Sequence, residues 1–168
     1  MNTKSVKGIF SVASVFILLF VLAKCYGPII SYNNEMLLSN KQAYTDFAIF
    51  CYKCYDSNNQ NEDVCSYAID ERRNLLYCNT TGESFLMNQS IIDSAHTINS
   101  TYMIDEQVLD CIYVSRNFVV FANVAGRGSL IYSVDDSRPD FVSLPDENCY
   151  RVYVERLTNR WYFVCRQN

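Results

Sequence analysis

The cysteines are the residues whose type and spacing could do the most chemistry. The chain of 168 residues holds eight of them, and Cys51 and Cys54 form a Cys-Tyr-Lys-Cys element. Such a pair can exchange disulfides when a helix N-terminus acidifies the first thiol and the second thiol resolves the mixed disulfide. Here the polar stretch Asp56–Asp63 follows the pair, without a helical pattern. The sequence therefore does not favour a thiol-disulfide catalyst.

Two other uses of these thiols remain open. The pair could join Cys65 and Cys78 in a four-thiolate zinc site, which is a cytosolic way to stabilise a small domain. We prefer structural disulfides, because the export features described below indicate an oxidising compartment. The cysteines expected to form bridges are Cys51, Cys54, Cys65, Cys78, Cys111, Cys149 and Cys165. Their pairing stays open, and Cys25 would lie at the membrane boundary and leave an odd number for the body.

Adjacent acidic residues and the single histidine do not form a catalytic set. Asp105-Glu106, Asp135-Asp136 and Asp146-Glu147 are neighbours in sequence, whereas a glycosidase needs two carboxylates facing each other across a cleft. His96 is the only histidine, so a multi-histidine metal site is excluded. We expect no enzyme activity, no metal and no cofactor.

Aromatic residues near the C-terminus could contact a protein or glycan partner. Those expected to form this partner-binding surface are Tyr150, Tyr153, Trp161 and Tyr162. Residues alternate between the two faces of a strand, so at least half of these side chains are expected in the core. The partner would contact whichever of them are exposed, because aromatic anchors dominate interface energetics.

Three glycosylation sequons crowd into one short stretch. They begin at Asn79, Asn88 and Asn99 and would carry N-linked glycans if the protein is exported. These sequons lie in the stretch Tyr52–Tyr102, which we expect to be the irregular half of the body, and glycans on them would block contact there. The C-terminal strands are therefore the predicted partner surface.

The N-terminus predicts a membrane anchor. Lys4 and Lys7 precede the uncharged run Gly8–Ala23, and Lys24 follows it. Sixteen helical residues reach roughly 24 Å, which also fits a cleaved signal peptide. Apolar residues resume up to Ile30, so we favour a retained anchor over residues 1–30 that contacts the membrane through residues 8–30, followed by an ectodomain over 31–168.

Charge predicts the orientation of this anchor and argues against one class of partner. Residues 24–168 carry twelve basic and eighteen acidic residues, so the positive-inside rule keeps the N-terminus cytoplasmic and sends the body across. The whole chain has a net charge of −4 and no basic block, which argues against nucleic acid as a partner.

The elements that must position these residues are mainly β-strands. A hydrophobic fraction of 49% predicts a folded core. A short membrane-proximal helix is predicted from Asn33 or Asn34 to Phe47, from apolar residues at helical spacing. Period-two segments rich in β-branched and aromatic residues predict strands at Phe47–Tyr52, Asn74–Asn79, Val108–Val114, Phe118–Val124, Ser129–Val134, Cys149–Glu155 and Arg160–Arg166. The fold class is therefore a disulfide-stapled antiparallel β ectodomain.

The layout of the chain resembles a viral protein family. The features are the lysine-flanked run Gly8–Ala23, the Cys51–Cys54 element and the tail from Cys149 to Cys165 on a body of 19.4 kDa. Together they resemble the baculovirus 19 kDa per os infectivity factors. The resemblance implies a virion envelope protein that passes through the host inner nuclear membrane. It also implies a role in a multiprotein entry complex for oral infection of midgut cells.

We therefore expect a non-enzymatic, single-anchor envelope protein that docks with other envelope proteins, with a host surface receptor as a possible further partner. The alternative is a secreted or surface lectin-like binding module that engages host glycan or protein. Cys149 and the segment Trp161–Cys165 resemble the closing strands of C-type lectin-like domains. The calcium-ligand triplets and the central tryptophan motif of those domains are absent, which argues against sugar binding.

Overall fold

The structure is a computed structural model that describes residues 37–57, 62–103, 109–123, 128–139 and 151–167. The expected anchor over 8–30, the boundary at residue 30, Cys149 and Tyr150 lie outside these ranges. No helix within the described ranges is both long and apolar enough to cross a bilayer.

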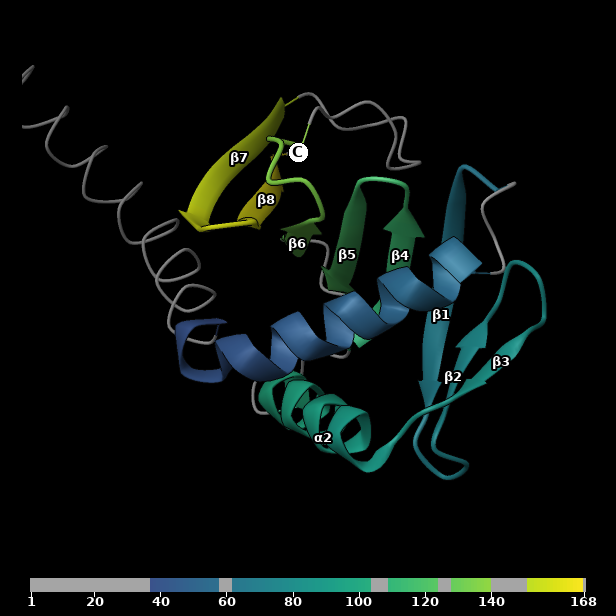
Figure 1. The fold of residues 1–168 in the computed structure, drawn as a ribbon. Coiled ribbons are helices and arrows are strands. Elements are labelled where there is room, and N and C mark those ends of the chain that lie inside the picture. The colour runs from purple at the N-terminus through teal and green to yellow at the C-terminus, as the bar shows by residue number, and fades with distance from the viewer. Residues whose placement is uncertain (1–36, 58–61, 104–108, 124–127, 140–150, 168) are drawn as a thin grey trace, which may run out of the picture. The chain divides into compact units, whose positions relative to one another are not determined.

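An eight-stranded sheet forms the centre of the described part (Figure 1). Its strands lie in the order β3-β2-β1-β4-β5-β6-β8-β7, and every neighbouring pair is antiparallel. Their bounds are β1 Val64–Asp70, β2 Leu75–Cys78, β3 Ser84–Leu86, β4 Leu109–Ser115, β5 Phe118–Asn123, β6 Ser129–Ser133, β7 Arg151–Thr158 and β8 Trp161–Gln167. The expectation of a mainly antiparallel β domain is confirmed.

Two helices cover one face of this sheet, which we call the inner face. The first spans residues 37–57, and α2 spans Gln89–Met103 (Figure 1). In the first helix Leu37, Tyr44, Phe47 and Cys51 are buried at three- and four-residue multiples, as expected for an apolar helix face. Asn88 is the N-cap of α2, because its Oδ1 accepts a hydrogen bond from the Ile91 backbone N–H at 3.0 Å.

The main core lies between the first helix and the inner face of the sheet. Tyr44 packs edge-on against Phe121 and Trp161, with ring centroids 5.6 and 6.0 Å away. Phe47 also contacts Phe121. The Trp161 indole N–H donates to Thr45 Oγ1 at 3.3 Å, so a polar bond fixes the helix to β8 within this aromatic core.

A second, smaller core lies on the opposite, outer face of the sheet. Ile131, Tyr162 and Val164 are almost fully buried there. Partly buried side chains from the neighbouring strands pack against them: Phe118, Val120 and Val154. The strands β6 and β8 are therefore buried on both faces, which explains why Ile131 and Tyr132 are apolar in succession.

Two sequence predictions about local structure are wrong. The segment Phe47–Tyr52 is not a strand, because the first helix continues through it to residue 57. The stretch Tyr52–Tyr102 is not irregular, since it contains β1, β2, β3 and almost all of α2. The CxxC element therefore lies inside the first helix, close to residue 57, where the description of that helix stops.

Candidate functional site

Five cysteines have side chains that the structure describes, and each of them is a free thiol: Cys51, Cys54, Cys65, Cys78 and Cys111. The expected bridges among these five are thus not formed in the structure. Cys149 and the side chain of Cys165 are outside the described part. Within that part, no three histidine, cysteine or acidic side chains gather into a metal-binding group, so the four-thiolate zinc arrangement is not formed.

The environment of Cys51 and Cys54 opposes thiolate chemistry. Both thiols are buried, on the helix side that faces the core. Burial raises the pKa of Cys51 well above its usual value, with a further contribution from nearby Cys54. Burial also raises the pKa of Cys54 to about 12. A redox-active CxxC needs an acidified thiol, and this pair has the opposite property.

Cys65 and Cys78 form a second thiol pair, on neighbouring strands. Burial, and then the proximity of Cys78, raise the pKa of Cys65 to about 11. At Cys78, burial acts to raise the pKa, but hydrogen bonds from the Thr81 hydroxyl and from the backbone N–H groups of Thr81 and Thr80 outweigh it. The pKa of Cys78 is consequently lowered, which makes its sulfur the more nucleophilic of the pair near neutral pH.

The predicted aromatic surface is only partly accessible. Trp161 and Tyr162 are 1% and 3% exposed, so neither is available to a partner, and these two residues belong to the half of the set that was expected in the core. Their burial follows from the sheet's two cores, because Trp161 enters the inner core and Tyr162 the outer one. Tyr153 lies on β7 opposite Cys165, and its side chain is outside the described part, as is all of Tyr150.

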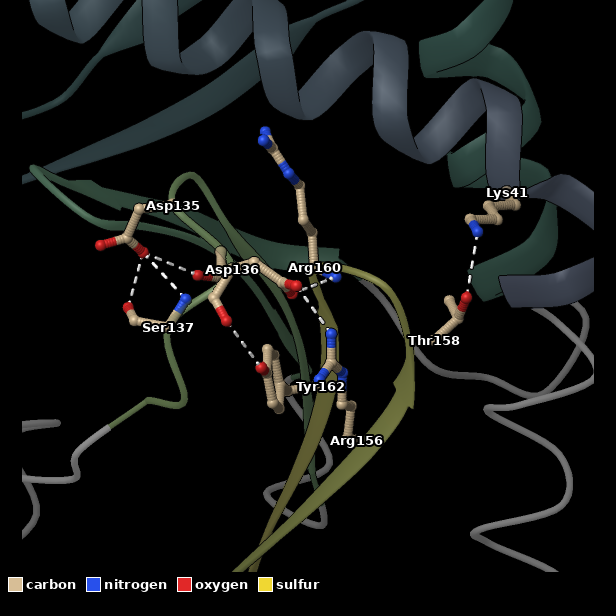
Figure 2. A network of polar contacts seen from close by, with 9 residues as sticks. Lys41, Asp135, Asp136, Ser137, Arg156, Thr158, Arg160 and Tyr162 are labelled. Atoms are coloured by element: carbon tan, nitrogen blue, oxygen red, sulfur yellow. Dashed lines mark hydrogen bonds and ion pairs between the residues drawn. The ribbon is translucent and has the colours of Figure 1, made fainter.

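A polar network around Asp136 fixes the turn between β7 and β8 (Figure 2). One Asp136 carboxylate oxygen accepts from the Arg156 guanidinium at 2.7 Å, and the other accepts from the Arg160 backbone N–H at 2.7 Å. The Asp136 carbonyl accepts from the Tyr162 hydroxyl at 3.1 Å. At the other end of the turn, the Lys41 ammonium donates to Thr158 Oγ1 at 3.1 Å. These bonds connect structural elements, so we assign the network to stability.

The three sequons lie in different environments. Asn79 is exposed in the turn between β2 and β3, and Asn88 is exposed at the start of α2. Asn99 is half-buried within α2, and its side-chain amide donates to the Glu71 carboxylate. His96 also lies on α2, with Nδ1 3.9 Å from the same carboxylate. Asn79 and Asn88 are therefore the accessible acceptor sites, while Asn99 takes part in a contact with the β1–β2 turn.

Asn88 also borders a groove between the two helices. The groove has a volume of about 310 Å³ and is lined by Asp46, Ile49, Phe50, Lys53, Asn88, Ser90 and Ile91. Its charged residues come from the first helix, and Asn88 and Ser90 come from the start of α2.

An exposed apolar patch lies on the outer face of β2 and β3. Leu86 is 75% exposed and Tyr77 is 41% exposed, and Leu75 pairs directly with Leu86 across the two strands. We call Leu75, Tyr77 and Leu86 the edge patch. Among the described strands, β3 ends the sheet and pairs on one side only. An apolar patch beside an unpaired strand edge is typical of a protein-binding surface.

Sequence reasoning missed this patch because it assigned the whole stretch to an irregular, glycan-covered half. One available signal was the run Asn74-Leu75-Leu76-Tyr77-Cys78, in which alternate residues must face away from the core.

No known protein family, curated protein or solved structure matches this chain.

Proposed function

We propose that the chain is a non-enzymatic, membrane-anchored envelope protein that joins a multiprotein entry complex of the baculovirus per os type. In this proposal the anchor is the run Gly8–Ala23 and the body faces away from the cytoplasm. Its partners are other envelope proteins. The observation that carries the binding role is the edge patch, where Leu86 is 75% exposed beside the free edge of β3.

The chemistry of the patch indicates the kind of partner. Leu75, Tyr77 and Leu86 offer apolar side chains, and the open edge of β3 offers backbone donors and acceptors. An extended partner segment can satisfy both, because it adds a strand to the edge and places alternate apolar side chains against the patch. We therefore propose that another envelope protein supplies such a segment.

The sequons set a condition on this binding mode. Asn79 lies in the turn at the other end of the β2–β3 hairpin from Leu75 and Leu86, so a glycan there leaves the patch open. Asn88 lies two residues after Leu86 and is exposed, so a glycan there would stand beside the patch. We expect chains in the assembled complex to be unmodified at Asn88. Glycopeptide mapping of the purified complex checks this, and full occupancy at Asn88 would contradict the edge-patch assignment.

A substitution in the patch tests the proposal directly. The full chain, carrying Leu86→Glu, is expressed in infected cells, and the co-purifying envelope proteins are quantified by mass spectrometry. The matched control is Leu38→Glu, because Leu38 is 56% exposed but lies on the first helix and not on the β2–β3 hairpin that carries the edge patch. We expect Leu86→Glu to reduce recovery of the partners at least tenfold and to reduce oral infectivity, while the control keeps both.

Two outcomes would overturn the proposal in different ways. Normal recovery of partners with Leu86→Glu would remove the edge patch as the interface. Loss of partners when Gly8–Ala23 is replaced by an unrelated anchor, with Leu86 intact, would place the interface in the membrane. Thermal unfolding of each variant shows whether the domain itself has kept its stability.

A further inference from the structure

Two thiols from separate strands meet on the inner face of the sheet. The register pairs Tyr67 of β1 with Cys78 of β2, and Cys65 lies two residues before Tyr67 on the same side of β1. Cys65 and Cys78 are therefore diagonal neighbours on one face, and their side chains turn toward each other closely enough to share a hydrogen bond. Both thiols are completely buried, and they hydrogen-bond to each other.

The turn after β2 completes the surroundings of the pair. The Gly82 backbone N–H donates to the Cys78 carbonyl at 2.8 Å, and the Cys78 N–H donates to the Glu83 carbonyl at 2.8 Å. The Ser66 backbone N–H donates to the Thr80 hydroxyl at 3.0 Å, which ties this turn back to β1. Strand pairing and the turn therefore hold the two cysteines in place independently of any covalent bond.

The other described cysteines are not placed to compete. Cys111 lies on β4, and its thiol donates to the Tyr67 carbonyl of β1 at 3.5 Å. It pairs with Ala122 and so belongs to the outer face, opposite the Cys65–Cys78 pair. Cys51 and Cys54 lie on the first helix, and no third cysteine of the described residues joins the pair within metal-binding reach.

We propose that Cys65 and Cys78 form a native disulfide that links β1 to β2. The oxidant is a small disulfide such as oxidised glutathione. The Cys78 thiolate attacks this disulfide and releases one glutathione thiolate. The Cys65 thiol then loses its proton and attacks the Cys78 sulfur, which releases the second. In total, two protein thiols lose two protons and two electrons, one S–S bond forms, and one glutathione disulfide becomes two thiols.

Burial of the pair determines when this exchange occurs. Neither thiol is accessible in the folded domain, so the oxidant must react before the β1–β2 hairpin packs under the helices. Once formed, the bond is shielded from soluble reductants for the same reason. In the cell this inference relies on the proposed placement of the body in an oxidising compartment, whereas refolding in vitro does not.

Peptide mapping of the full chain tests the pairing without any substitution. The chain is purified in detergent, unfolded, refolded with oxidised and reduced glutathione, alkylated, and digested with trypsin and a glutamate-specific protease. Cleavage after Glu62, Glu71, Arg73 and Glu83 separates Cys65 and Cys78 from all other cysteines. We expect one linked species that joins the peptide holding Cys65 to the peptide holding Cys78.

Stability provides the second measurement. The wild-type chain refolded under oxidising conditions should have a Tm about 10 °C higher than the same chain refolded with a reductant, because the bond closes a loop of about 15 residues. Cys65→Ser should have the same Tm after oxidising and after reducing refolding, whereas Cys111→Ser, the control, should show the same difference as the wild type. Alkylation of both Cys65 and Cys78 after refolding, or linkage of either to another cysteine, would overturn the inference. That result would leave the edge patch and its assembly assay unaffected.

Discussion

At the scale of single residues, Asp136 stabilises the turn between β7 and β8 through the hydrogen bonds of its carboxylate. Its carboxylate binds Arg156 and the Arg160 backbone, and both Asp136 and Arg160 adopt a left-handed backbone with φ of 63°. Residues other than glycine, asparagine and aspartate rarely adopt this conformation without strain. The hydrogen bonds to Asp136 therefore offset the conformational cost at two positions, at Asp136 itself, which follows β6, and at Arg160, in the turn between β7 and β8.

Substitution of Asp136 separates the hydrogen bonds from the backbone conformation. Asp136→Ala loses the bonds to Arg156 and to the Arg160 N–H, and alanine disfavours the left-handed φ, so we expect a loss of about 2 kcal/mol in the free energy of unfolding. Asp136→Asn keeps an acceptor oxygen and tolerates this φ, and should lose less than half as much. Urea denaturation measures both variants, and equal losses would contradict the conformational part of this argument.

Asp135 predicts a dependence of stability on pH. Its carboxylate accepts hydrogen bonds from the Ser137 hydroxyl at 2.6 Å, from the Ser137 N–H at 3.0 Å and from the Ser133 hydroxyl at 3.1 Å. The bonds from Ser137 contribute most to lowering the pKa of Asp135 below its usual value. A lowered pKa in the folded state means that ionised Asp135 stabilises the fold above the unfolded-state pKa. That stabilisation is lost as the pH falls through the folded-state pKa.

The measurement is a series of thermal unfolding curves between pH 7 and pH 2. We expect Asp135→Asn to have a lower Tm than the wild type at neutral pH. The difference should shrink as the pH falls below the usual aspartate pKa of about 4. A difference in Tm that stays constant across the whole range would show that the ionisation of Asp135 is not responsible.

At the scale of elements, the first helix gains its stability from one aromatic stripe. Phe47 is completely buried and contacts Phe121 of β5, whereas Leu38 on the same helix is 56% exposed. Phe47→Ala should therefore cost about 3–5 kcal/mol, and Leu38→Ala should change stability by less than about 0.5 kcal/mol. Denaturant unfolding followed by tryptophan fluorescence reports on this region, because Trp161 lies in the same cluster. Similar losses for both variants would contradict the packing assignment.

The strands of the C-terminal half were predictable because each is a short apolar run between turn residues. The segments Phe118–Val124 and Ser129–Val134 differ from β5 and β6 by one residue at the C-terminal end. By contrast, α2 was missed, because its serine, threonine and asparagine residues have low helix propensity. The available signal was the buried series Ile91, Ala95 and Ile98, at four- and three-residue spacing.

The first helix was predicted too short for a related reason. Phenylalanine, isoleucine and tyrosine in Phe47–Tyr52 favour strands by propensity, but the helical spacing of Tyr44, Phe47 and Cys51 continues through the run. Packing against the sheet decides such cases, and a single sequence does not contain that information. The edge patch was missed for the same reason, because its exposure depends on which strand ends the sheet.

At the scale of the whole molecule, the two faces of the sheet differ in what covers them. The helices cover the inner face, and the outer core covers β6 and β8 on the other side. In β1, β2 and β3, the exposed large apolar side chains lie on the outer face. They are Val64, Tyr77 and Leu86. The binding proposal therefore depends on the body lying on the side of the membrane where its partners are.

The orientation of the anchored chain is the last prediction. The first 34 residues carry three lysines and no acid, while the rest of the chain carries all eighteen acidic residues. The positive-inside rule predicts a cytoplasmic N-terminus, so a C-terminal tag on the full chain in sealed microsomes should resist added protease until detergent opens the vesicles. Changing Lys4 and Lys7 to Glu should weaken this protection, whereas Lys53→Glu, which is remote from the run Gly8–Ala23, should not. Digestion of the wild-type tag without detergent would place the body in the cytoplasm, and the proposed docking among exported envelope domains would then fail.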